Sequence, residues 1–135
     1  MDYVIEKSFV NKYINKNRKE RILYELKSSK KRKNAVSRFC HNTSDLLNKE
    51  KIIYKADYYS ERFFKEIFKE KKIHQGYIVA MDDKFDGKIV SEIDFFDMVL
   101  IDLMCVIFIT DNNCVIISEE ENGKRESFLL ESYSR

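Results

Sequence analysis

The chain of 135 residues fits one domain spanning 1–135, because single domains cluster near about 100–150 residues. Its 44% hydrophobic content argues against intrinsic disorder despite 36% charged residues, and zero proline with three glycines excludes collagen-like, proline-linker and glycine-rich-loop proteins. No apolar run reaches about 18 residues and no signal-peptide pattern opens the chain, so we expect a soluble protein that does not enter a membrane.

Charge is divided unevenly along the chain. Residues 1–74 hold 20 Lys or Arg against 10 Asp or Glu, a net of +10, whereas residues 75–135 hold 5 against 13, a net of −8. Such a split informs on partners more than on fold. Lys, Ile, Asn, Phe and Tyr are plentiful while Ala is scarce, which is typical of a low-GC bacterial genome.

The basic half is predicted to be helical. In residues 3–27 apolar side chains recur every three or four positions, which indicates one buried helical stripe, and Asn15–Asn17 interrupts it. Ser28-Ser29 offers a stop, after which residues 35–40 form a shorter stripe. The best-defined helix is predicted at residues 57–72, where aromatic side chains repeat on one face.

The acidic half begins with a strand, a turn and a helix. The apolar run Tyr77–Met81 is typical of a buried strand, and Asp86-Gly87 signals a turn. Ser91, with Asp94 three positions later, resembles a capping box and predicts a helix of about ten residues.

Three strands are predicted to follow, at Val106–Thr110, Cys114–Ser118 and Ser127–Glu131, because these runs are rich in β-branched or aromatic residues. Asn122-Gly123 joins the last two, and Asn-Gly is the strongest short hairpin signal. The expected class is α+β, with N-terminal helices packed on a small, mainly antiparallel sheet of about four strands in the order helices then β-α-β-β-β. The place of the first strand beside the later three is left open.

Three cysteines, Cys40, Cys105 and Cys114, are an odd number without a CxxC pair. We therefore expect no disulfide framework and no cysteine-based metal or redox site. Cys105 and Cys114 lie in apolar runs, where free cysteine behaves as a small buried hydrophobe. Inert thiols indicate a reducing compartment, so we expect a cytoplasmic protein.

Few side chains are candidates for catalysis or metal binding. The two histidines, His41 and His74, are interpreted as a helix-end residue and a linker residue, and no zinc, nucleophile-elbow, phosphate-loop or dinucleotide motif occurs. Asp82–Gly87 faintly resembles a calcium loop, but Lys84 stands third and Ile93 stands twelfth, where glutamate is needed. We expect a non-enzymatic protein without cofactor or metal, and an active site assembled from scattered side chains is the third hypothesis.

The densest basic region covers residues 18–38. Clustered cations neutralise phosphates and release counterions, which gives salt-dependent binding to nucleic acid. A solvated helical face and a contact for an acidic protein are the other interpretations. The candidate nucleic-acid contacts are Arg18, Lys19, Arg21, Lys30, Lys31, Arg32 and Lys33.

Two acidic segments are the candidate contacts for a protein partner, and solvated turns are the alternative. They comprise Asp82, Asp83, Asp86, Glu119, Glu120 and Glu121. Their charge fits a basic surface on a toxin domain or, through self-association, the basic half of a second copy.

Two segments, RKERILYELKSSKKRKNAVSRFCH and later CVIISEEENGKRESFLL, place a basic helical half before an acidic β-rich half. In this order the sequence resembles small bacterial proteins of uncharacterised function and, more distantly, immunity proteins of toxin–immunity systems. The resemblance implies a soluble, cytoplasmic, non-catalytic protein that binds a toxin domain tightly. It transfers no functional residue. The leading hypothesis is a non-enzymatic protein-binding module, with such an immunity protein as its specific form, and the alternative is a nucleic-acid-binding protein using the basic helical half.

Overall fold

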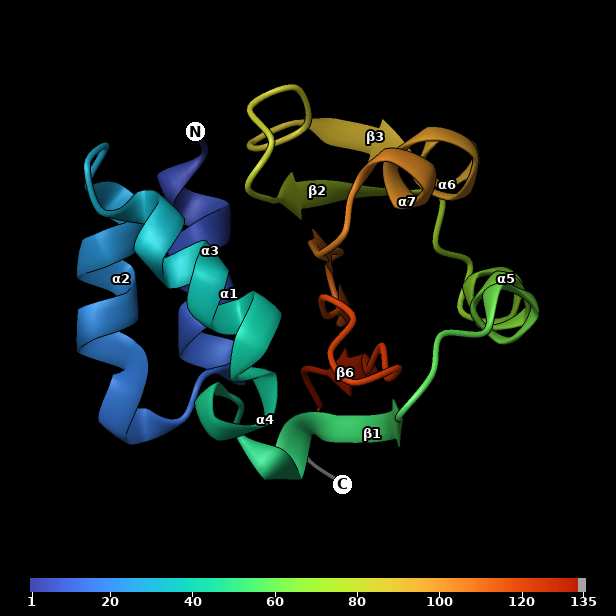
Figure 1. Cartoon of the computed structure of the whole chain (residues 1–135), viewed down its shortest axis with the longest axis horizontal. Coiled ribbons are helices and arrows are strands. Elements are labelled where there is room, and N and C mark those ends of the chain that lie inside the picture. Colours follow the sequence, from blue (N-terminus) through green and yellow to red (C-terminus); the bar gives the residue numbers. More distant parts are fainter. Residues whose placement is uncertain (134–135) are drawn as a thin grey trace.

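The computed structural model describes residues 1–133 and contains a six-stranded sheet between two layers of helices (Figure 1). Neighbouring strands are antiparallel throughout, in the order β1-β6-β5-β4-β2-β3. The strands are β1 (Ile52–Ala56), β2 (Gln75–Val79), β3 (Ile89–Ser91), β4 (Val106–Ile109), β5 (Asn113–Ile117) and β6 (Ser127–Glu131). The predicted α+β class is confirmed.

The helices cover opposite faces of this sheet in two groups (Figure 1). The first group is α1 (Tyr3–Tyr13), η1 (Lys16–Arg18), α2 (Lys19–Lys27), α3 (Arg32–His41), α4 (Thr43–Leu46) and η2 (Lys49–Lys51). The second is α5 (Glu61–Glu70), α6 (Glu92–Asp94), the π-helical turn η3 (Phe95–Val99) and α7 (Leu100–Asp102). Because α6, η3 and α7 follow one another without a gap, they form one irregular helix, the 92–102 helix. Among residues 1–133, no helix has both the length and the apolar character needed to cross a bilayer.

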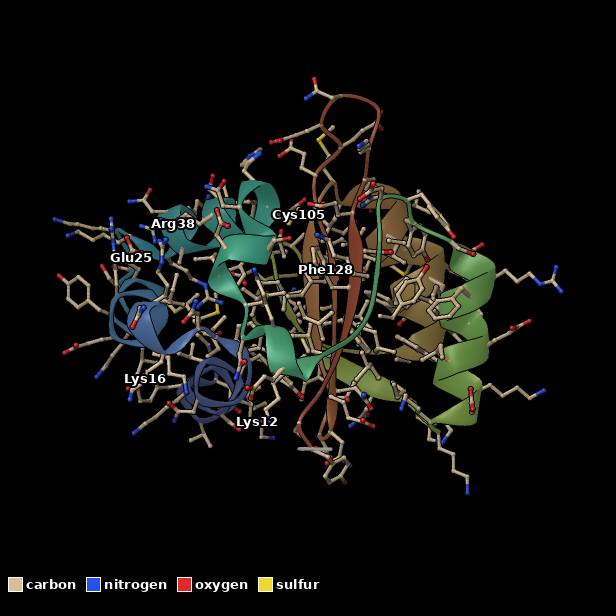
Figure 2. All side chains as sticks on the ribbon, turned by 90° about the horizontal axis from the view of Figure 1, so that it is seen from below. Lys12, Lys16, Glu25, Arg38, Cys105 and Phe128 are labelled. Atoms are coloured by element: carbon tan, nitrogen blue, oxygen red, sulfur yellow. A yellow bond between two sulfur atoms is a disulfide. The ribbon has the colours of Figure 1, made fainter. Side chains whose placement is uncertain are left out.

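The central strands are buried on both faces, which explains their unbroken apolar sequences. In β4, Ile107 and Ile109 pack with the first group of helices, whereas Val106 and Phe108 pack with the second. This division follows from the alternation of side chains along a strand. Phe128 of β6, labelled in Figure 2, belongs to the first of the two cores.

The second core is built largely from phenylalanine. Phe68 of α5, Phe95 of the 92–102 helix and Phe108 of β4 meet with ring centroids 4.3–5.7 Å apart. A Cβ atom at Gly76 of β2 would lie 2.4 Å from Cζ of Phe108. Glycine at this position therefore makes room for the aromatic cluster.

Local sequence signals mark where two helices begin and where one hairpin turns. The Ser60 and Ser91 hydroxyls accept hydrogen bonds from the backbone N–H groups of Phe63 and Asp94, so both serines cap the helices that follow them. Asn122 and Gly123 have φ values of +53° and +77°, as the predicted hairpin turn requires.

The sheet has two more strands than the sequence predicts. Both additional strands, β1 and β3, are its edges, and β1 comes from the basic half of the chain. The first predicted strand, β2, lies between β4 and β3. An edge strand is paired on one side and is less buried, so its apolar pattern is weaker than that of a central strand.

The prediction about cysteines is wrong for two of the three residues. Cys40 at the end of α3 and Cys105 just before β4 form a disulfide, with Cα atoms 5.6 Å apart and a sequence separation of 65. Such a distant pair leaves no local spacing signal. Cys114 is free and buried as predicted, and burial raises the pKa of its thiol. The inference from free thiols to a reducing compartment therefore fails.

The disulfide is expected to stabilise the fold substantially. Closing a loop with a sequence separation of 65 reduces the entropy of the unfolded chain, which corresponds to about 4 kcal/mol of unfolding free energy. Urea denaturation should show this loss when Cys40→Ser is compared with the oxidised native chain. Reductant should destabilise the native chain but leave the unfolding of Cys40→Ser unchanged. Intact-protein mass spectrometry checks that the native chain carries the bond. An equal effect of reductant on both proteins would contradict the assignment.

Candidate functional site

A buried cluster of charges surrounds Arg32, the first residue of α3. Its Nε and Nη2 atoms donate to Asp86 Oδ2 and Oδ1 at 2.7 and 2.9 Å. Its Nη1 and Nη2 atoms also donate to Glu6 Oε1 and Oε2 at 2.5 and 2.8 Å, and Nη1 reaches the carbonyl oxygen of Leu26 at 3.1 Å. All three charged side chains are less than a tenth exposed. One guanidinium therefore holds two carboxylates from distant parts of the chain.

Neighbouring groups complete this cluster. The Tyr77 hydroxyl donates to Glu6 Oε2 at 2.5 Å and accepts from the backbone N–H of Asp2, while the Ala80 N–H donates to Asp86. Burial and the Glu6 carboxylate raise the pKa of Tyr77, which keeps the hydroxyl protonated as a donor. Burial alone would lower the pKa of Arg32, but the hydrogen bonds from its guanidinium to Asp86 and Glu6 raise it overall, so its charge persists.

This arrangement corrects two predicted sites. Arg32 was a candidate nucleic-acid contact and Asp86 a candidate protein contact, yet in the structure they bind each other inside the molecule. Both are less than a tenth exposed, and their charges are paired with each other. Their spacing of 54 positions hides the pairing from the sequence.

The remaining basic candidates lie at the surface of the first helical layer. They are Arg18, Lys19, Arg21, Lys30, Lys31 and Lys33, and Lys19 is the partly buried member. Tyr24 stands among them with 60% of its surface exposed, and Lys31 Nζ lies 5.3 Å from its ring centroid. Arg38, by contrast, forms a bidentate ion pair with Glu25 of the adjacent α2 (Figure 2). The surface around Tyr24, here called the basic face, combines cations with an exposed aromatic ring.

The two acidic segments lie at different places. Asp82 and Asp83 are exposed, and Lys84 in the same turn reaches Asp102 Oδ2 of α7 at 3.5 Å. The turn is therefore beside the end of the 92–102 helix. Asp83 Oδ1 is 3.9 Å from Lys33 Nζ, in a pair exposed on both sides.

The acidic hairpin tip folds onto the end of α3. The two ring nitrogens of His41 lie 3.2 Å from Glu119 Oε2 and 2.5 Å from Glu121 Oε1. The Glu119 N–H also donates to the carbonyl oxygen of Cys40, next to the disulfide. His41 is thus a helix-end residue as predicted, and it has two carboxylate partners that the sequence did not indicate.

A surface that the sequence analysis missed lies on the 92–102 helix and the residues after it. We call it the acidic–apolar face and define it by Ile93, Met98, Ile101 and Met104. Their exposed fractions are 66, 44, 74 and 72%. Hydrophobicity along the sequence does not tell which side of an irregular helix faces water, so these exposed side chains could not be distinguished from core residues.

The π-helical turn explains the spacing of this face. Ile93 and Met98 are five positions apart across η3, and Ile101 and Met104 follow at intervals of three. A π-helical turn is wider than an α-helical one, so residues five apart share a side. Acidic residues lie between them at Asp94, Asp97 and Asp102. Residues 89–123 contain eight Asp or Glu and no Lys, Arg or His.

The described residues hold no group of three or more His, Cys, Asp or Glu side chains arranged to bind a metal ion. Comparison of the chain with protein-family models, curated proteins and solved structures found no match. The surfaces of the protein are therefore what point to its function.

The Arg32 cluster gives a direct test of its structural role. Arg32→Met leaves Glu6 and Asp86 facing each other in the interior without a cation, and breaking a buried pair in this way costs about 3–5 kcal/mol. Urea denaturation should show this loss for Arg32→Met and almost none for Lys31→Met, its exposed neighbour. Equal stability of the two variants would mean that the cluster does not hold the fold together.

Proposed function

We propose that the protein is a non-enzymatic protein-binding module whose acidic–apolar face binds a partner with a basic and partly apolar surface. The observation that carries the proposal is the row of exposed apolar side chains on the 92–102 helix and at Met104. Contiguous apolar surface on a soluble protein commonly marks an interaction site. When a partner covers these side chains, their apolar surface is removed from water, and this stabilises the complex.

Side-chain chemistry favours recognition of a protein. Met98 and Met104 are unbranched and adapt their shape to a partner, as methionines do on other binding surfaces. Ile101, the most exposed of the four, is placed to act as an anchor. Asp102 and Asp83 are paired with Lys84 and Lys33, and Arg125 donates to the carbonyl oxygen of Met104. Asp94 and Asp97 are exposed and form no salt bridge within residues 1–133, so they give the face its acidic field, and Asp82 adds charge beside α7. Such a field accelerates association with a basic surface.

A bacterial toxin domain is the partner class that we propose, with the protein acting as its immunity protein. Sequence organisation supports this through the resemblance noted above, and fast electrostatic association suits an inhibitor that must outpace its target's activity. A cytoplasmic location is part of the same proposal and depends on the resemblance alone, since the Cys40–Cys105 disulfide removes the argument from free thiols.

The proposal predicts that the apolar face provides most of the affinity. The full chain, immobilised, is used to capture its partner from the source cells, and the partner is identified by mass spectrometry and purified. Ile101→Ser with Met104→Ser should then lower affinity about 100-fold in calorimetry, because central apolar contacts contribute about 1–2 kcal/mol each. Val4→Ser is the control, since Val4 is 77% exposed but lies on α1.

Charge is tested on the same complex. The association rate should fall steeply between about 50 and 500 mM salt. Asp94→Lys with Asp97→Lys should slow association more than Glu120→Lys or Lys31→Glu does. Unchanged affinity in the Ile101/Met104 variant would refute the apolar face as the contact, and capture of the chain's own second copy would replace a toxin with self-association.

Nucleic-acid binding through the basic face is the second candidate, and the exposure of Tyr24 among cations favours it. An exposed aromatic ring lets an unpaired base stack, while nearby Lys and Arg neutralise phosphates.

This candidate predicts that Tyr24→Ala weakens binding of a fluorescent single-stranded oligonucleotide at low salt about tenfold, whereas Tyr58→Ala does not. Tyr58 is the matched control because it is 64% exposed outside the basic face. Lys30→Gln with Lys31→Gln should reduce the salt slope by about 1–2 units. Absence of any oligonucleotide binding at 20 mM salt removes the candidate.

A further inference from the structure

A cleft of about 630 Å³ lies between α1, the segment 71–77 that enters β2, and the β4–β5 turn at 109–113. Small-molecule sites have volumes of about 300–1,000 Å³. None of the residues that define the acidic–apolar face lines this cleft. It is therefore independent of the surface proposed above for a protein partner.

Lysine side chains gather around the cleft. Lys12, Lys71 and Lys72 line it together with His74, against the carboxylate of Asp111. Lys12 is labelled in Figure 2, and its Nζ donates to the backbone carbonyl of Asp111 at 3.1 Å, so its charge is not cancelled by a carboxylate there. Lys71 pairs with Glu131, whereas Lys72 forms no salt bridge within residues 1–133. Two lysines thus leave positive charge at the cleft.

Tyr13 places a buried hydroxyl beside the cleft. The residue lines the cleft and is 1% exposed. Burial raises the pKa of Tyr13, the nearby Cys114 and Glu131 raise it further, and a hydrogen bond with the Ser132 side chain opposes this rise. The hydroxyl therefore stays protonated and has a polar neighbour of its own.

The backbone at Lys72 is the second unusual feature. Its φ is +57°, in the left-handed region that favours glycine, at the position just after α5 where helices commonly end in glycine. Nothing in the packing requires a lysine here, because its side chain is exposed. What lysine adds at this position is a cation at the edge of the cleft.

Apolar groups complete the lining. Phe9, Tyr77 and Ile109 are buried core residues that also border the cleft, so its wall is partly hydrophobic. We propose that this cleft binds a small organic carboxylate, with the anion held by Lys12 and Lys72 and the apolar body against Phe9 and Ile109. This inference does not depend on the proposed function.

The test uses 2-naphthoate as the probe and the neutral 2-naphthamide as its matched control. Titration of the ¹⁵N-labelled full chain with 2-naphthoate should shift amide signals at residues 71–77 and 109–113, with a Kd of about 1 mM or below for a ligand of this size. The amide should bind at least about fivefold more weakly, because it lacks the charge that the lysines recognise.

Variants locate the contacts. Lys12→Gln and Lys72→Gln should each weaken naphthoate binding about threefold or more. Lys30→Gln is the control and should leave binding unchanged, because Lys30 is exposed but does not line the cleft. Lys72→Gly should weaken binding while raising Tm, since glycine relieves the left-handed backbone.

Three results would overturn the inference. One is naphthoate shifts centred on residues 18–33, which would indicate general attraction to the basic face. Another is equal binding of naphthoate and naphthamide. The third is unchanged naphthoate affinity in both Lys12→Gln and Lys72→Gln.

Discussion

A guanidinium in the interior is the constraint on which the rest of the fold depends, because α3 can pack only when the charge of Arg32 is neutralised. Glu6 comes from α1 and Asp86 from the turn after β2, so the partners belong to opposite halves of the chain. Buried ion pairs contribute little net stability compared with apolar packing, but a mispaired arrangement leaves a charge in the interior. The cluster therefore selects one way of docking the helical layer on the sheet.

Some of the charged residues that make the two halves of the sequence differ are paired with each other inside the molecule. Arg32 and Arg38 bind carboxylates within or beside the helical layer, and His41 holds the acidic hairpin tip. The surplus remains on the basic face and on the 92–102 helix, which lie on opposite sides of the sheet (Figure 1). Because screening acts over about 8 Å at physiological salt, these two surfaces do not neutralise each other within one molecule. Contact between unlike faces of two copies would be head-to-tail and would tend to propagate, whereas binding to a distinct partner gives a closed complex.

Sequence patterns were sufficient for the parts of the fold that are decided locally. Ser91 and Asn122-Gly123 act through neighbours in sequence, and the apolar runs of β4 and β5 report burial directly. The Cys40–Cys105 bond and the Arg32 cluster depend on pairing over 65 and 54 positions, for which one sequence holds no spacing signal. For the same reason the acidic candidates were identified as charged surface, but the pairing of Asp86 and of Glu119 with partners inside the chain was not.

The acidic–apolar face was missed for a different reason, which also bears on its meaning. The second core needs Phe95, Phe96, Val99 and Leu100 on one side of the 92–102 helix, and the wider π-helical turn brings this closely spaced set inward. Core packing therefore requires apolar residues on the inward side of this helix, but it does not require them on the outward side. Asp94, Asp97 and Asp102 show that polar side chains fit there. The apolar character of Ile93, Met98 and Ile101 is therefore not a by-product of core packing, and contact with another molecule is the physical role it leaves open.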